Sequence, residues 1–174
     1  LTVLTPGAGQ KLVANFFSMD PIKTEIVVLG AGPGGYAAAF YAADLGKKVL
    51  LIERDKRLGG VCLNRGCIPS KALLHATHQI TSARESDHRG ITFAAPTVDL
   101  AKLRVWKESI LTKLGAGVAQ LAKLRNVQVI QGKAYFEGSQ TLRVENEQGQ
   151  QFVNFDTAIV AVGSLPALPK AFDL

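Results

Sequence analysis

The sequence predicts an α/β fold in which a parallel sheet is followed by a small antiparallel β portion. Between residues 24 and 53, two short apolar runs flank an alanine-rich segment, and this spacing of about thirty residues matches one strand–helix–strand unit. A long helical segment then precedes a series of short strand-like runs near the end of the chain. This order favours one parallel sheet with an antiparallel extension.

Residue type predicts the first strand, the first helix and the second strand. Thr24–Gly30 (TEIVVLG) is a β-branched apolar run ending in glycine, which is typical of a buried parallel strand. The alanine-rich helix is expected to stop at Gly46, because glycine is common just after the last helical turn. Lys47–Glu53 (KKVLLIE) is then the second strand.

Two further helices and several strands are expected downstream. Residues from Cys67 to about Arg84 repeat apolar side chains at helical spacing, and Asp99 can cap a longer helix after a loop over 85–98. Glycine is costly inside a helix, so the GAG of Gly115–Gly117 predicts a kink or a close backbone contact. Strand-like runs follow over residues 127–132, 133–138, 141–146, 151–155 and 157–163.

Composition and charge narrow the class of protein. The chain has 174 residues, of which 47% are hydrophobic and 20% charged, as expected for a globular domain with its own core. The net charge is +6, but the basic residues are scattered and no aromatic platform accompanies them, so we expect no nucleic-acid partner. No apolar run approaches the roughly 18 residues of a membrane span, so we expect no membrane association.

The ends of the chain suggest how it divides. Residues 1–22 are interpreted as a disordered or linker segment, because they contain glycines and prolines and show no periodicity. Residues 23–174 are interpreted as one incomplete domain, since the proline-rich end contains no element that would close it. The start has no basic region typical of a signal peptide, so a cytoplasmic location is expected.

The glycine-rich stretch GAGPGG joins the first strand to the first helix. Gly30 permits a tight turn, Gly32 lets the backbone approach a pyrophosphate, and Gly35 lets the helix pack on the strand. The phosphates would lie at the helix N-terminus, where free N–H groups point outward. Glu53 ends the second strand, where a carboxylate accepts hydrogen bonds from ribose hydroxyls and repels the 2′-phosphate of NADP. The pattern predicts dinucleotide binding without distinguishing FAD from NAD; the alternative is a turn whose glycines serve packing.

Cys62 and Cys67 are the only cysteines, and they lie in GGVCLNRGCIPSK. A structural disulfide over so short a loop closes little chain entropy and is typical of secreted proteins. A zinc site with His75 and His78 is a second alternative, but its ligand spacing is unusual and Lys71 would place a positive charge nearby. We therefore expect no metal.

A redox pair is the third interpretation of the cysteines. Cys67 lies at the start of a predicted helix, where the helix dipole favours a thiolate. Arg65 and Lys71 add positive charge, and glycines on either side allow the backbone to pack against a flat group. The pair also follows Glu53 within ten residues or so, which places a dithiol close to the predicted dinucleotide.

Two stretches carry a resemblance to a known family. VVLGAGPGGYAAAFYAADLGKKVLLIERDKRLGG resembles the FAD-binding start of the flavoprotein disulfide reductases, and GGVCLNRGCIPSKALLH resembles their active-site motif. Within this family, IPSKALLH is most similar to the branch that oxidises dihydrolipoamide in 2-oxo acid dehydrogenase complexes. The resemblance runs from about Lys23 to Leu168 and implies a Rossmann-like FAD-binding domain.

The resemblance also implies roles for individual residues. Cys67 would be the thiol nearest the flavin and Cys62 the thiol that meets the substrate, while Lys71 would lie by the flavin ring. The backbone of Ala134 would contact the adenine end, and Gly163 would belong to the turn that returns to the flavin. The implied cofactor-binding residues are Gly30, Gly32, Pro33, Gly34, Gly35, Glu53, Arg54, Gly60, Val61, Lys71, Ala134 and Gly163.

The family also implies protein partners and an electron acceptor whose binding site would lie outside this chain. Electrons would pass from dihydrolipoamide to the cysteine disulfide, to FAD and to NAD⁺, whose site would lie outside this chain because no second G-x-G-x-x-G is present. Lipoyl domains of 2-oxo acid dehydrogenase complexes would be the partners, and the full-length protein would be a homodimer. The chain alone would then be inactive. The alternatives are another reductase of this family, of mercuric or glutathione reductase type, or a non-catalytic dinucleotide- or zinc-binding module.

Overall fold

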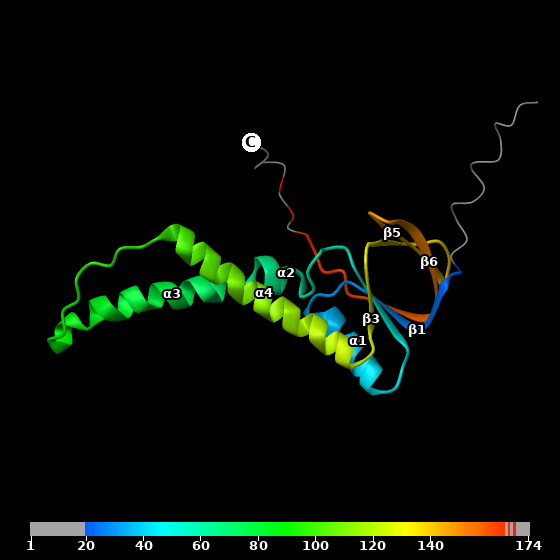
Figure 1. The fold of residues 1–174 in the computed structure, drawn as a ribbon, viewed down its shortest axis with the longest axis horizontal. Coiled ribbons are helices and arrows are strands. Elements are labelled where there is room, and N and C mark those ends of the chain that lie inside the picture. Colours follow the sequence, from blue (N-terminus) through cyan, green and yellow to red (C-terminus); the bar gives the residue numbers. More distant parts are fainter. Residues whose placement is uncertain (1–19, 166, 168, 170–174) are drawn as a thin grey trace, which may run out of the picture.

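The computed structural model describes residues 20–165, 167 and 169, and they form a mixed sheet covered on one face by helices (Figure 1). The sheet has six strands in the order β3-β2-β1-β6-β5-β4. Strands β3, β2, β1 and β6 run parallel, while β6, β5 and β4 pair antiparallel. The strands are β1 (Ile22–Leu29), β2 (Val49–Glu53), β3 (Gln128–Gln131), β4 (Lys133–Phe136), β5 (Thr141–Asn146) and β6 (Gly149–Val160). The predicted α/β fold with an antiparallel extension is confirmed.

Four α-helices and one 3₁₀ turn connect these strands. They are α1 (Pro33–Asp44), α2 (Gly60–Arg65), α3 (Cys67–Glu85), η1 (Asp87–Arg89) and α4 (Leu100–Leu124). Helix α4 begins as predicted, because the Asp99 carboxylate accepts a hydrogen bond from the backbone N–H of Lys102 at 3.0 Å. Helix α2 was not predicted, since six residues are too few to show a periodic apolar face.

Strand β6 corrects the prediction of two separate strands over 151–155 and 157–163. It is one strand of twelve residues, and Ala161–Gly163 lie beyond it. Its first half pairs antiparallel with β5, and from Val153 onward it pairs parallel with β1. Asp156 separates the two predicted runs because it is polar, but it is exposed, and the pairing with β1 continues on either side of it at Phe155 and Thr157.

The core has two parts, one on each face of the parallel strands. On one face, Val28 and Leu51 pack against α1 and the end of α4 through Phe40 and Ala122. On the other face, the antiparallel strands fold over the sheet and bury it. The second cluster comprises Val27, Leu29, Leu50, Ile52, Leu142, Val144, Val153 and Phe155. The parallel strands are therefore covered on both faces, which explains their continuous apolar sequence.

Helix α4 continues through the GAG without an interruption, so the predicted kink is absent. The alternative, a close contact, is present at Gly115. A Cβ there would lie 2.9 Å from Cγ of Arg57, whose guanidinium bonds Glu108 of the same helix at 2.8 Å. Gly117 has nothing within 4 Å of its Cβ position, so no packing within the described residues requires it.

Helices α3 and α4 form a long hairpin that extends away from the sheet (Figure 1). Only Ala72 of α3 is buried, and every residue from Ile91 to Val98, in the connection, is exposed. No described helix combines the length and the apolar character needed to cross a membrane. Most of the segment predicted as a linker, residues 1–19, lies outside the described residues; β1 begins at Ile22, one residue inside that segment.

Candidate functional site

A cavity of about 610 Å³ opens at the carboxyl ends of the parallel strands. Its wall combines five segments: the β1–α1 turn, the end of β2 with the loop after it, α2, the start of β4, and the residues after β6. This is where ligands bind in open α/β sheets. The lining residues are Leu29, Gly30, Gly32, Pro33, Gly34, Ile52, Glu53, Arg54, Asp55, Gly60, Val61, Cys62, Arg65, Gly132, Lys133, Ala134, Ala161, Val162, Gly163 and Ser164.

The three predicted glycines of the β1–α1 turn have different structural reasons. Gly30 has a φ of 92°, and a Cβ would lie 2.5 Å from the carbonyl oxygen of Ala161. A Cβ on Gly35 would lie 1.7 Å from the carbonyl oxygen of Gly30, which confirms that this glycine serves helix–strand packing. At Gly32 the nearest atom would be Cα of Gly60 at 3.9 Å, an ordinary contact. The protein itself therefore leaves room for a side chain at Gly32, and a ligand is the better reason for its absence.

The amino end of α1 fits an anionic group. Gly32 is the N-cap residue and provides no side-chain hydrogen bond, so no side chain caps the free N–H groups of the first turn. The first turn also contains no acidic residue, and nothing lies within 4 Å of a Cβ at Gly34. Free N–H groups, the positive end of a twelve-residue helix and open space beside Gly32 and Gly34 together suit a pyrophosphate.

Glu53 connects the glycine turn to the end of β2. It is 7% exposed, and its two carboxylate oxygens accept hydrogen bonds from the backbone N–H groups of Ala31 (2.7 Å) and Asp55 (2.9 Å). Each carboxylate oxygen has a further lone pair, so a ribose hydroxyl can still donate to it. Glu53 therefore fixes both loops that border the cavity and remains available to a ligand.

The two cysteines come from successive helices. Cys62 lies in α2 and is half-buried, whereas Cys67 is the first residue of α3 and is exposed; both are free thiols. The pKa of Cys62 is raised, first by its hydrogen bond with the Cys67 side chain and next by partial desolvation. Gly66 separates the helices, and a Cβ there would lie 3.2 Å from the carbonyl oxygen of Val61. The two thiols thus lie close enough, at the junction of α2 and α3, for Cys67 to raise the pKa of Cys62.

Most of the residues predicted for the site line the cavity. Eleven of the fourteen do so, and Gly35, Cys67 and Lys71 do not. Gly35 lies behind the turn, while Cys67 and Lys71 lie exposed in the first turn of α3. The cavity wall contains Cys62 rather than Cys67, so the expectation that Cys67 faces the flavin stays a prediction.

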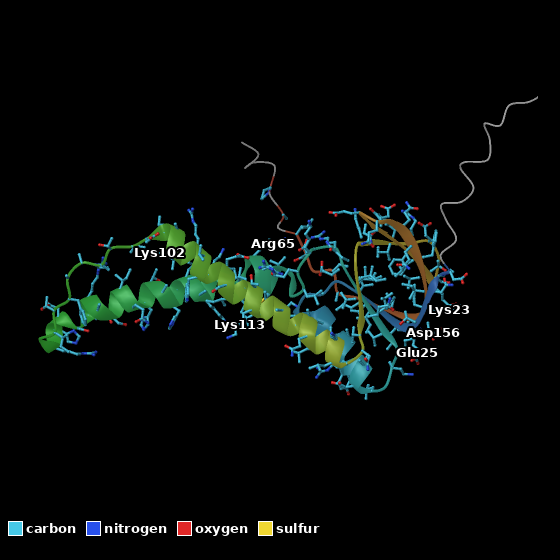
Figure 2. The ribbon with its side chains drawn as sticks, viewed as in Figure 1. Lys23, Glu25, Arg65, Lys102, Lys113 and Asp156 are labelled. Carbon is cyan, nitrogen blue, oxygen red and sulfur yellow. The ribbon has the colours of Figure 1, made fainter. Side chains whose placement is uncertain are left out.

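An ion pair that the sequence did not indicate crosses the cavity wall. Arg65 of α2 bonds Asp55 of the β2–α2 loop at 2.7 Å, and both residues line the cavity. Figure 2 labels Arg65 on α2, and residues 161–164, after β6, line the same cavity. The sequence predicts that Arg65 adds positive charge near Cys67; in the structure, its guanidinium pairs with the Asp55 carboxylate instead. Spacing along the chain does not indicate this pairing.

Metal ligands do not gather around the cysteines. Among residues 20–165, no group of three or more histidine, cysteine, aspartate or glutamate side chains is arranged to hold a metal ion. His75 and His78 lie on α3 and are exposed.

The fold and the cavity define a class of protein: a parallel α/β domain whose glycine turn fits a dinucleotide and whose adjacent helix contributes one of two neighbouring thiols. Comparison with known families gives a narrower identification. Residues 24–173 match the family described as pyridine nucleotide-disulphide oxidoreductase, and the chain belongs to it.

Several relatives are similar over most of this chain. A dihydrolipoyl dehydrogenase of Vibrio cholerae is 52% identical over 145 residues, which cover 83% of this chain and 30% of the relative. The Bacillus subtilis and Haemophilus influenzae enzymes of the same name are 51% and 50% identical, with coverage of 31% and 30% of their lengths. The chain therefore spans about 30% of the length of these relatives.

Solved structures give the same fold. The flavoprotein disulfide reductase RclA of Escherichia coli, determined as a Cu(II) complex, superposes with a TM-score of 0.71 at 27% identity. The match covers 85% of this chain and 30% of RclA. A cysteine-to-serine mutant of RclA, also determined as a Cu(II) complex, gives a TM-score of 0.70 at 26% identity.

Proposed function

We propose that this chain is the FAD-binding portion of a dihydrolipoyl dehydrogenase, which oxidises dihydrolipoamide and passes the electrons to NAD⁺. One observation carries the proposal: the thiol of Cys62 shares a cavity wall with the glycine turn and Glu53. A dinucleotide in this cavity would then lie beside Cys62, whose pKa is raised chiefly by the neighbouring Cys67. About 50% identity to dihydrolipoyl dehydrogenases supports the choice of substrate.

The cofactor-binding residues have distinct roles in this proposal. The N–H groups at the start of α1, next to Gly32 and Gly34, bind the pyrophosphate, and Glu53 accepts hydrogen bonds from the adenosine ribose. Backbone atoms of Ala134 would border the adenine end and Gly163 would lie near the flavin; both residues line the cavity. Lys71 contributes positive charge near the flavin ring. The remaining binding residues are Gly30, Pro33, Gly35, Arg54, Gly60 and Val61.

The cysteines exchange disulfides with the substrate. One thiolate of dihydrolipoamide attacks Sγ of Cys62 in the oxidised pair, forming a mixed disulfide and releasing Cys67 as a thiolate. The second substrate thiol then displaces Cys62, so the substrate leaves as a cyclic disulfide and the cysteines retain two electrons. Cys67 is the first residue of α3, so the positive end of this helix and the Lys71 side chain lie near the departing sulfur. FAD, when bound, supplies the two-electron transfer from this pair to NAD⁺.

The proposal includes partners outside the chain. The natural dithiol is carried by lipoyl domains of 2-oxo acid dehydrogenase complexes in the cytoplasm, and the full-length enzyme is a homodimer. The NAD site lies in the part of the relatives that this chain does not span, so the chain alone should bind flavin without sustaining NAD⁺ reduction.

The visible spectrum of the purified chain tests the cofactor. We expect a flavin band with about one FAD per chain, and we expect Gly32→Val to lose it because the side chain would occupy the place of the pyrophosphate. Gly138→Val is the matched control, since its Cβ position is also open but lies outside the cavity wall. A colourless chain that takes up no added FAD would refute the proposal, as would equal flavin content in both variants.

Anaerobic titration tests the reaction. One equivalent of dihydrolipoamide should reduce the oxidised cysteine pair and give a long-wavelength band, whereas reduced glutathione should not, and Cys62→Ser should abolish the change. The same spectral change with glutathione at a similar rate would favour another reductase of this family.

A further inference from the structure

Asn64 makes an unusual set of contacts next to Cys62. Its side-chain amide nitrogen lies 3.4, 3.2 and 3.0 Å from the carbonyl oxygens of Arg57, Leu58 and Gly60. An amide nitrogen has two protons, so three carbonyls share two donors. The side-chain oxygen Oδ1 is buried and has no hydrogen-bond partner among the described residues. Exchanging the positions of nitrogen and oxygen would direct Oδ1 at three carbonyl oxygens, so the surroundings determine the orientation of the amide.

The loop that Asn64 contacts is also bound to the glycine turn. The N–H of Gly59 donates to the carbonyl oxygen of Ala31 at 2.8 Å. Gly60, with a φ of 60°, lies so close to the turn that a Cβ would be 2.6 Å from Cα of Gly32. Residues 57–60 are therefore held between the glycine turn on one side and Asn64 on the other.

Helix α2 has few other means of keeping its position. It has six residues, its N-cap Gly59 provides no side-chain hydrogen bond, and Leu63 is its only buried residue. Helices this short are not stable by themselves. The exposed Asp55–Arg65 ion pair is worth little. Burying Oδ1 without a partner has a free-energy cost, so the three contacts of the amide nitrogen are the better explanation for asparagine at this position.

We infer that Asn64 is a positioning residue, which fixes Cys62 relative to both the glycine turn and Cys67 by holding the 57–60 loop against α2. The importance of Asn64 for catalysis rests on the proposed function, in which Cys62 is the thiol that meets the substrate. Asn64 would then keep this thiol in a fixed position beside the cofactor. Asn64 does not itself line the cavity, so it acts through the backbone of Gly60 and through α2.

Differential alkylation tests the inference without any flavin. Trypsin cuts after Arg57, Arg65 and Lys71, so Cys62 and Cys67 fall on separate peptides and their rates can be measured in one sample. In Asn64→Ala we expect iodoacetamide to modify Cys62 about tenfold faster relative to Cys67, which corresponds to losing one or two net hydrogen bonds. Asn64→Asp should have at least as large an effect, because its carboxylate would face three carbonyls.

The pH profile separates positioning from general destabilisation. The titratable groups that act on Cys62 are Cys67 and Lys71. If α2 shifts in the variant, Cys67 raises the pKa of Cys62 less. The curve of Cys62 alkylation rate against pH then moves to lower pH. Asn146→Ala is the matched control, because the Asn146 side chain donates a hydrogen bond to the carbonyl oxygen of Gln131 (3.0 Å) and accepts one from the N–H of Gln148 (2.9 Å), outside the cavity wall. This variant should leave both the rate ratio and the pH profile unchanged.

Three results would overturn the inference: a Cys62-to-Cys67 rate ratio within twofold of the unchanged chain, a milder effect of Asn64→Asp than of Asn64→Ala, or equal effects in Asn64→Ala and Asn146→Ala. If Asn64→Ala does not fold by circular dichroism, Asn64→Ser is measured instead. Its hydroxyl can keep one hydrogen bond, so we expect a rise of about threefold, and no rise overturns the inference. Absence of flavin from the unchanged chain would count against the proposed function and would leave this comparison intact.

Discussion

Strand β2 buries all five of its residues, whereas α3 buries only Ala72 among nineteen. This difference in burial distinguishes two regions. One is an α/β body, which is packed on both faces of the parallel strands. The other is the α3–α4 hairpin, in which the end of α4 packs on the body and the remainder extends away from it (Figure 1). The body is stabilised by its own core. In the hairpin, the N-terminus of α4 has a side-chain cap at Asp99, whereas the N-terminus of α3 has none. Cys62 and Cys67 lie on opposite sides of the junction between the two regions.

The largest expected effect contrasts a leucine from each region. Leu51 is fully buried in the body, and Leu51→Ala should lower the free energy of unfolding by about 2–5 kcal/mol, since it leaves a cavity. Leu74 on α3 is 67% exposed, so Leu74→Ala should change the free energy of unfolding by less than about 0.5 kcal/mol. Urea unfolding monitored by circular dichroism measures both. Similar losses in the two variants would mean that the hairpin has a core of its own.

A second prediction concerns the tight packing of the glycine turn. Gly35→Ala should destabilise the chain by about 1–3 kcal/mol, because its Cβ would collide with the carbonyl oxygen of Gly30 and force the backbone to move. Gly34→Ala provides the control, since nothing lies within 4 Å of its Cβ and alanine is the better helix former. Thermal unfolding of both variants measures the difference; equal midpoints would contradict the observed helix–strand contact.

A third prediction applies to the hairpin alone. Asp99→Ala removes the side-chain bond to the N–H of Lys102 and should cost about 1 kcal/mol, with the loss confined to the first turn of α4. Hydrogen exchange should be faster at residues 100–103 and unchanged in β2, which acts as the internal control. A comparable loss of protection in β2 would show that the two regions unfold together.

The smallest expected effect is a shift in the pKa of Cys62, at the junction of α2 and α3. The raised pKa of Cys62 means that its thiol keeps its proton to higher pH than an ordinary cysteine, so it reacts slowly near neutrality. Contact with Cys67 is the largest cause, and Cys67→Ala should therefore lower this pKa and move the iodoacetamide profile of Cys62 to lower pH. An unchanged profile would assign the raised pKa to desolvation instead.

Elements with a strong local signal could be predicted from the sequence. The run VVLG, the capping Asp99 and the alanine-rich helix each satisfy a local rule, and all three are present. The sequence predicted a kink or a close contact at Gly115 but could not say which. The close contact is present for a tertiary reason, because the side chain of Arg57, far away in the chain, packs where a Cβ would be. The continuity of β6 was missed because pairing with β1, rather than residue type, carries the strand through Asp156.

The candidate site shows the same division. The glycine turn, Glu53 and Cys62 were found because their chemistry depends on residue type at a set spacing, and they line one cavity. The ion pair between Asp55 and Arg65 and the contacts of Asn64 depend on how the β2–α2 loop folds back on α2. Neither pattern has a signature in the sequence, since polar residues in a loop are usually solvated.

The double pairing of β6 has a consequence for how the length of this chain can vary. Val153 is paired with Ile22 of β1 and with Leu142 of β5, so a residue inserted or deleted here would shift both ladders together. Because side chains alternate between faces, such a shift would exchange Val153 and Phe155 with exposed neighbours. Residues 91–98 lie in no ladder and are exposed throughout, so they can accept an inserted peptide tag or a spectroscopic label, whereas β6 cannot.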